Sequence, residues 1–79
     1  MYIIAALYHF TRFSDPDGLR APLKALCEAQ DVKGTLLVAG EGINGTIAGP
    51  RAGIDAVIAH IKKLPGCSAL EWKESTAKS

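Results

Sequence analysis

The segment from Lys33 to Gly49 holds the residues best suited to chemistry, because an apolar run leads into a glycine-rich stretch with one acid and one amide. Its glycines match the dinucleotide-binding pattern G-x-G-x-x-G at Gly40, Gly42 and Gly45. That pattern needs a helix after the last glycine, whereas the short β-branched run from 46 to 48 predicts a second strand. Asn44-Gly45 tolerates the positive φ angles of a type I′ turn, so we predict a β-hairpin with its turn there.

The predicted hairpin tip has two interpretations. In the functional one, the glycines let a nucleotide or another backbone approach, while Glu41 supplies an acceptor and Asn44 an oriented amide. This pair suits a base edge or a ribose better than a phosphate, which Glu41 would repel. In the purely structural one, Asn44-Gly45 makes the turn, the other glycines permit a bulge, and Glu41 is a solvated carboxylate.

Other residues give weaker indications of chemistry. His9 and His60 are isolated, and the sequence suggests neither a metal site nor a nucleophilic triad. Cys27 and Cys67 are too far apart for a C-x-x-C motif, so we expect reduced thiols, with Cys27 on the apolar stripe of a helix. Arg12, Lys73 and Lys78 have two interpretations: they form a small basic rim near the strand ends, or they only make the surface soluble.

Composition limits the classes of function. The chain has 79 residues, nine Lys or Arg, eight Asp or Glu, and a net charge of +1, so it is one small domain whose overall field does not indicate nucleic-acid binding. Any such contact has to be local. No apolar run approaches the ~20 residues of a membrane span and no signal-peptide pattern opens the chain, so we expect a cytoplasmic protein without a membrane partner.

The elements follow the order strand, helix, strand, strand, helix, strand. A strand is predicted over 2–10. A helix entered through Asp15-Pro16 is predicted to run to about Gln30, and because of Pro22 it either starts later, near Gly18, or kinks. After the hairpin, a helix follows Gly49-Pro50 with one apolar stripe, and a last strand covers 68–73. The stripe consists of Ile54, Val57, Ile58, Ile61 and Leu64.

This order predicts an α+β, ferredoxin-like (acylphosphatase-like) βαββαβ fold, an antiparallel sheet with two helices on one face. The other face then has no cover, so Tyr2, Ile4 and Tyr8 are candidates for a surface that receives a partner, a further domain or a stacked base. Two activities of this fold fit less well. An acylphosphatase would need a phosphate-binding loop that residues 11–15 do not offer, and an RNA-recognition module would need aromatic residues in 45–49.

Three groups of residues carry a resemblance to a known family. They are Lys33-Gly34 leading into Leu36-Leu37-Val38, then Glu41-Gly42-Ile43-Asn44-Gly45-Thr46 with Ala48-Gly49, and Leu70-Glu71-Trp72-Lys73-Glu74-Ser75. Together they resemble the N-terminal acylphosphatase-like domain of bacterial rhodanese-domain proteins that act as tRNA uridine hydroxylases. The resemblance covers nearly the whole chain. It implies, for the full-length enzyme, oxygen-dependent 5-hydroxylation of the wobble uridine 34 of tRNA.

The resemblance also implies how the chain is organised. Residues 1–74 would form the ferredoxin-like domain, and 75–79 a polar tail leading to a rhodanese-like domain that this chain lacks. Neither cysteine matches the loop cysteine of that domain, so we expect no catalytic residue here, and no cofactor is identified. We expect contacts with the tRNA anticodon arm or with the rhodanese-like domain from Glu41, Gly42, Ile43, Asn44, Gly45, Lys73 and Arg12. The alternative is a purely structural docking domain of a rhodanese-type sulfurtransferase.

Overall fold

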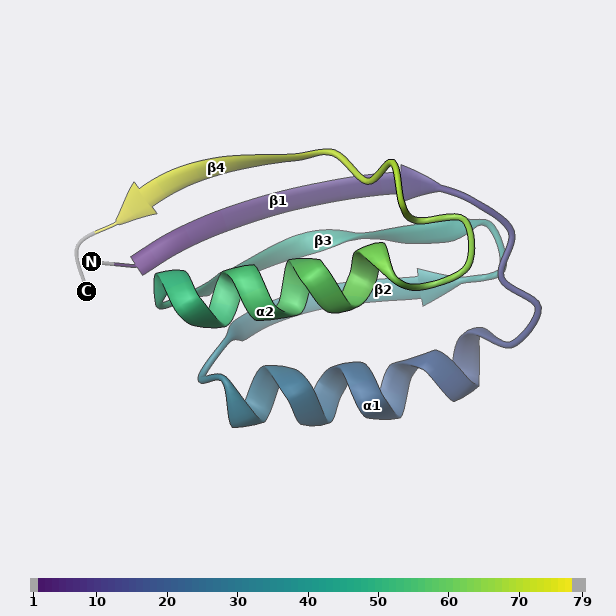
Figure 1. Cartoon of the computed structure of the whole chain (residues 1–79), viewed down its shortest axis with the longest axis horizontal. Helices are drawn as coiled ribbons and strands as arrows, with labels where there is room; N and C mark the ends of the chain where they lie inside the picture. The colour runs from purple at the N-terminus through teal and green to yellow at the C-terminus, as the bar shows by residue number, and fades with distance from the viewer. Residues whose placement is uncertain (1, 78–79) are drawn as a thin grey trace.

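A computed structural model describes residues 2–77 and shows a four-stranded antiparallel sheet with two helices on one face (Figure 1). The elements are β1 (Tyr2–Phe10), α1 (Pro16–Ala29), β2 (Lys33–Ala39), β3 (Gly42–Gly49), α2 (Arg51–Lys62) and β4 (Trp72–Ala77). The strand order is β2-β3-β1-β4, so the first strand lies in the centre and the last at an edge. The predicted ferredoxin-like fold is confirmed.

Both helices begin and end close to where the sequence places them. The side chain of Asp15 accepts a hydrogen bond of 3.1 Å from the Gly18 N–H, and Pro16 occupies the first helical position, so α1 begins at Pro16 rather than near Gly18. The helix continues through Pro22. In α2 the predicted apolar stripe faces the sheet, with Ile54, Val57, Ile58 and Ile61 buried.

The hairpin is the main correction to the sequence analysis. Its turn is Gly40-Glu41, because Ala39 pairs with Gly42, whereas Asn44 pairs with Leu37 in the middle of the ladder. Gly45 serves close strand packing instead of a turn: its φ is +151°, and a Cβ there would lie 2.0 Å from the carbonyl oxygen of Thr35 on β2. The prediction of a turn at Asn44-Gly45 is therefore wrong.

The last strand is also displaced from its predicted position. Residues 63–70 form successive turns, in which the Leu70 N–H donates to the Cys67 carbonyl, and β4 begins only at Trp72. It then continues to Ala77, which pairs with Tyr2, so residues 75–77 belong to the sheet and not to the predicted polar tail. Residues 78 and 79, including Lys78 of the predicted basic rim, lie outside the described residues.

One hydrophobic core lies between the sheet and the helices. Its buried members come from both helices, from β1, β2 and β3, and from the connections between elements. They are Ala5, Leu7, Phe13, Leu23, Val32, Val38, Ile43, Ile47, Ile54, Val57, Ile58, Ile61, Cys67 and Leu70. The alternation along β1 puts Ala5 and Leu7 on this covered face and Tyr2, Ala6 and Tyr8 on the other, as predicted. We call the uncovered side of the sheet the open face.

Three connections gather at one end of the molecule, opposite the end where Tyr2 and Ala77 pair. They are the β1–α1 connection, the β2–β3 turn and the α2–β4 connection (Figure 1). Hydrogen bonds join them: the Thr11 N–H donates to the Glu41 carbonyl at 3.2 Å, and His9 Nε2 donates to the Gly66 carbonyl at 2.7 Å. This loop end holds the predicted functional residues of the hairpin.

Candidate functional site

The candidate site lies on the open face near the loop end. Tyr8, Asn44 and Leu37 form one cross-strand row, because Tyr8 pairs with Asn44 and Asn44 pairs with Leu37. The next row contains Phe10 and Gly42, which again pair directly. Gly42 and the two aromatic residues line a hollow of about 170 Å³.

Apolar side chains that the helices do not cover surround this hollow. Tyr8 is 60% exposed, Phe10 69% and Leu37 60%, although large apolar side chains are usually buried. The rings of Tyr8 and Phe10 meet edge to face, with centroids 4.8 Å apart and an interplanar angle of 81°. The open face therefore presents a small, ordered aromatic surface.

Two polar side chains complete the hollow, and both were predicted. Glu41 in the turn and Asn44 on β3 line it together with the aromatic residues. Both are exposed, so the carboxylate and the amide remain free to contact a ligand. The structure thus brings Glu41 and Asn44 to one place, but on a strand and a turn rather than on one loop.

The other predicted contact residues are distributed differently. Ile43 is only 2% exposed and its side chain belongs to the core, although it is among the residues that line the hollow. Gly42 and Gly45 are positions of close strand packing, and a Cβ on Gly42 would lie 2.2 Å from the His9 carbonyl oxygen. Arg12 lies beyond the tip, where it lines a separate, wide hollow with Glu41.

Lys73 lies on the open face but across the central strand from Asn44. It pairs with Ala6 on β1 and lines a hollow of about 430 Å³ with Tyr8, Trp72 and Glu71. Tyr8 therefore lines both this hollow and the one beside Asn44. The ring of Tyr8 is the feature that connects the predicted residues into one surface.

Sequence reasoning missed Phe10 and Leu37. The signal for Phe10 is the alternation of β1, because it follows Tyr8 by two residues and so shares its face. Leu37 lies in an almost continuous apolar strand, where alternation alone does not show which of its residues the helices cover. The exposed side chains become visible only once the register is known.

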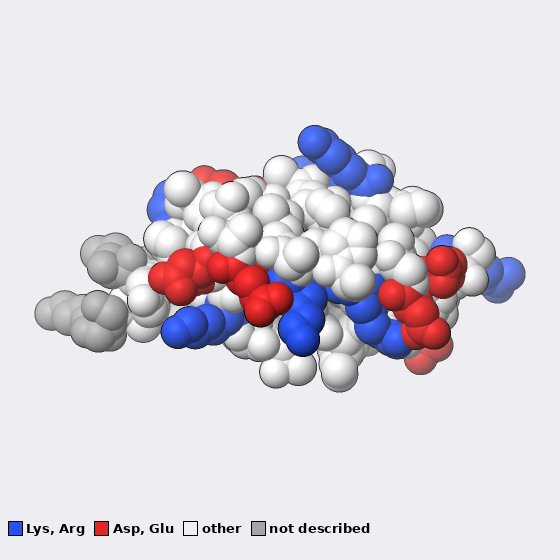
Figure 2. Space-filling view, turned by 90° about the horizontal axis from the view of Figure 1, so that it is seen from below, with Lys and Arg blue, Asp and Glu red and all other residues white. Residues whose placement is uncertain are grey.

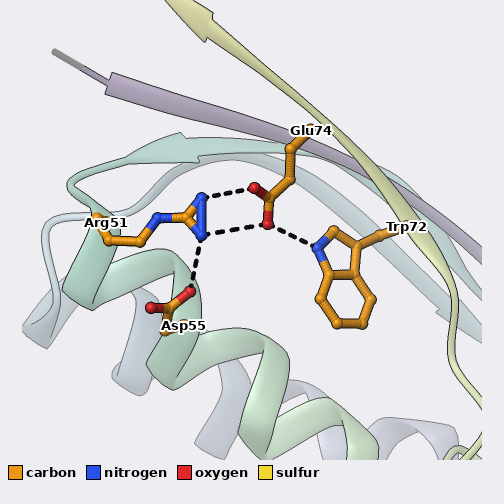
Figure 3. A network of polar contacts seen from close by, with 4 residues as sticks. All are labelled: Arg51, Asp55, Trp72 and Glu74. Carbon is orange, nitrogen blue, oxygen red and sulfur yellow. Dashed lines mark hydrogen bonds and ion pairs between the residues drawn. The ribbon is translucent and has the colours of Figure 1, made fainter.

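The opposite side of β4 carries a charged network with a structural role (Figure 3). Arg51 of α2 donates to both carboxylate oxygens of Glu74, at 2.6 and 3.3 Å, and to Asp55 at 3.1 Å. The indole N–H of Trp72 donates to Glu74 at 2.8 Å, and Lys62 lies 5.6 Å from the Trp72 ring centroid. These contacts join α2 to the edge strand.

Neither cysteine has the features of a reactive thiol. Both are free, and Cys67 is fully buried while Cys27 is partly buried. Burial raises the pKa of each thiol, and Glu28 adds to the rise at Cys27, so both stay protonated near neutral pH. Among residues 2–77 no cluster of three or more His, Cys, Asp or Glu could hold a metal ion.

The loop after β1 does not offer the phosphate cradle of an acylphosphatase. Its Thr11 and Phe13 N–H groups already donate to the carbonyls of Glu41 and Gly40, at 3.2 and 3.0 Å. Two donors that could contact a phosphate are thus used inside the domain. Across the described part of the chain, no helix is long and apolar enough to cross a membrane.

Comparison with known sequences identifies the family. The family model described as "UPF0176 acylphosphatase like domain" matches residues 2–79. The chain belongs to this family. The description agrees with the predicted fold. It calls the domain acylphosphatase-like and does not name an acylphosphatase activity.

Several curated relatives of this UPF0176 domain carry the name tRNA uridine(34) hydroxylase. The protein from Jannaschia sp. (strain CCS1) is 77% identical over 98% of the chain, and that from Roseobacter denitrificans is 65% identical over 99%. The protein from Caulobacter vibrioides (strain NA1000 / CB15N) is 60% identical over 98%. The chain spans only about a quarter of the length of these relatives, 26%, 26% and 24% respectively.

Proposed function

We propose that this domain is the N-terminal part of a tRNA uridine(34) hydroxylase, an oxidoreductase that hydroxylates the wobble uridine at its ring 5-position in an oxygen-dependent reaction. The observation that carries the proposal is the identity of 77% and 65%, over nearly the whole chain, to relatives with that name. The alternative of a docking domain in a sulfurtransferase has no comparable support, since those relatives are named as hydroxylases.

Within such an enzyme, we assign this domain to tRNA recognition or to positioning of the part that performs the chemistry. The exposed open face with Tyr8, Asn44 and Glu41 supports a contact role. Burial of Cys67 and partial burial of Cys27 raise the pKa of both thiols, which makes a nucleophilic role for either cysteine unfavourable. A tRNA substrate entails a cytoplasmic location, and a rhodanese-like domain following this one remains part of the proposal.

The test is a chimaera in which residues 2–77 of this chain replace the aligned residues of the Jannaschia relative. It would be expressed in a bacterial strain that lacks its own uridine-34 hydroxylase, and 5-hydroxyuridine would be quantified by mass spectrometry of tRNA digests. We expect hydroxylation close to that of the unmodified relative. A soluble, folded chimaera that yields no 5-hydroxyuridine, while the relative does, would contradict the proposal.

The same chimaera tests the role of the hollow. The change Asn44→Ala removes an exposed amide that makes no hydrogen bond within residues 2–77, so we expect the domain to stay folded and modification to fall. Unchanged 5-hydroxyuridine would exclude Asn44 from the contact.

A further inference from the structure

The open face combines exposed aromatic, polar and basic groups. Three of its large apolar side chains are more than half exposed, namely Tyr8, Phe10 and Leu37. Burying an apolar side chain of this size contributes about 1.5–3 kcal/mol, so the fold forgoes that stabilisation here. A contiguous exposed patch of this kind indicates that something binds to it.

The open face carries two lysines that can contact an anion. Strand register and alternation place Lys33 of β2 and Lys73 of β4 on the open face, one at each edge. Acidic side chains reach this face just outside the strands: Glu41 lines the hollow beside Asn44, and Glu71, which precedes β4, lines the hollow with Lys73. Neither Lys33 nor Lys73 takes part in an ion pair among residues 2–77. The acids that do form ion pairs lie elsewhere. Asp17 belongs to α1, Asp55 to α2, and Glu74 to the helix side of β4.

The helix side contrasts with this pattern. Viewed from the α1 side, positive and negative side chains are interspersed along the surface rather than gathered by sign (Figure 2). Ion pairs of this kind neutralise their own field and offer no net attraction to a polyanion. On the open face, exposed rings lie beside lysines that form no ion pair among residues 2–77.

We propose that the open face binds unpaired uridine-containing RNA, with a base stacked on Tyr8, its edge in the hollow between Glu41 and Asn44, and a backbone phosphate at Lys73. This inference rests on the proposed function and names the part of the substrate that this domain holds. Single-stranded nucleic acids are bound by such combinations of aromatic platforms and cationic edges. Phe10, edge-on to Tyr8, fixes the orientation of the stacking ring.

The polar groups of the hollow predict a preference for uracil over cytosine. Uracil carries an N–H donor at N3 flanked by two carbonyl acceptors, which a carboxylate and an amide N–H can match. Cytosine carries an acceptor at N3, which would face the Glu41 carboxylate without a proton between them. Glu41 repels phosphate from the hollow beside Asn44, and we place the backbone phosphate at Lys73 on the other side of Tyr8, in the hollow that Glu71 also lines.

The experiment uses the isotope-labelled 79-residue chain and five-nucleotide oligouridine or oligocytidine, at about 0.15 M salt. Backbone amide shifts should concentrate on the open-face strands near Tyr8 and Asn44, with tighter binding of oligouridine. Tyr8→Ala should weaken binding about 5- to 150-fold, which is the range measured for loss of one stacking contact. Glu41→Gln should reduce the preference for uridine.

Two lysine variants provide a matched control. Lys73→Gln removes a cation from the open face and should lower the slope of log affinity against log salt by about 0.7, the value for one phosphate contact on a single strand. Lys63→Gln removes the same charge at the end of α2 and should leave the slope unchanged. Equal effects of both variants would overturn the placement of the phosphate.

Shifts confined to the helix side, or Tyr8→Ala binding as tightly as the unmodified chain, would overturn the inference. A second result would also overturn it: the folded chain binds neither oligonucleotide, and Tyr8 becomes buried in the full-length chimaera. The open face would then be a protein-docking surface. The proposed function would survive each of these results, because it depends on hydroxylation by the chimaera. Failure of hydroxylation with intact oligouridine binding would reject the function alone.

Discussion

The two faces of the sheet satisfy their side chains in different ways. On the helix-covered face, Ala5, Ile47 and Ile54 are at most 2% exposed, and the nearby charges of Arg51 and Glu74 pair with each other. On the open face, Tyr8 and Leu37 are each 60% exposed. The covered face accounts for the stability of the domain, and the open face carries groups that stability does not require.

The largest expected contrast is between two apolar truncations on opposite faces. Ile47→Ala removes buried methyl groups and should lower the free energy of unfolding by about 2–5 kcal/mol. Leu37→Ala, on the neighbouring strand but the open face, should change it by at most about 0.5 kcal/mol. Urea unfolding of both variants measures the difference. If Leu37→Ala were as destabilising as Ile47→Ala, the open face would be part of the core.

A second contrast separates the two uses of glycine in the hairpin. Gly45→Ala puts a Cβ 2.0 Å from the Thr35 carbonyl oxygen at a φ of +151°, so we expect a loss of about 2–4 kcal/mol. Gly40→Ala meets nothing closer than 3.9 Å and should change stability by less than about 1 kcal/mol. Thermal unfolding distinguishes the two. If both variants were similarly stable, Gly45 would not be required for close packing of β3 against β2.

These contrasts also show what the sequence could predict. The periodicity of α2 identified Ile54, Val57, Ile58 and Ile61 because a helix buries a stripe with a spacing that sequence alone reveals. The cap at Asp15 was recognisable for the same reason, since it is a local interaction. Local signals of this kind were enough to predict the fold.

The site depended on strand register, which is not local. Asn44-Gly45 has the composition of a turn, but the close approach of Thr35 explains Gly45, and this contact exists only after β2 and β3 pair. The exposure of Leu37 likewise follows from which face of β2 the helices cover. Glu41 and Asn44 were predicted as neighbours of one tip and are in fact joined by the hollow beside Tyr8.

A smaller effect is expected from the network on the covered side of β4. The Arg51 and Glu74 side chains are 48% and 35% exposed, so water and salt screen the pair. A double-mutant cycle with Arg51→Ala and Glu74→Ala should give a coupling of about 0.5–1 kcal/mol at low salt, decreasing at 0.5 M salt. A coupling near zero at low salt would mean that the network does not fasten α2 to β4.

The smallest predicted effect concerns the pH dependence of stability. Burial raises the pKa of the Cys67 thiol above its ordinary value of 9.0, so the unfolded chain loses this proton first as the pH rises. The thiol's contribution to stability is present below pH 9 and is lost above it. Between pH 7 and 9 the unmodified chain should lose at most about 0.4 kcal/mol more than Cys67→Ala. If Cys67→Ala lost more stability than the unmodified chain over this pH range, the pKa of the thiol would be lowered by folding rather than raised, which would contradict this account.

The most direct test of the central claim, that the open face serves tRNA modification, is the level of 5-hydroxyuridine at position 34 produced by the chimaera with the Jannaschia relative. We would compare Tyr8→Ala on the open face with Lys63→Gln on the helix side, after confirming by circular dichroism that both fold. The account predicts that Tyr8→Ala loses most of the modification while Lys63→Gln retains it. Equal modification by the two folded variants would contradict it.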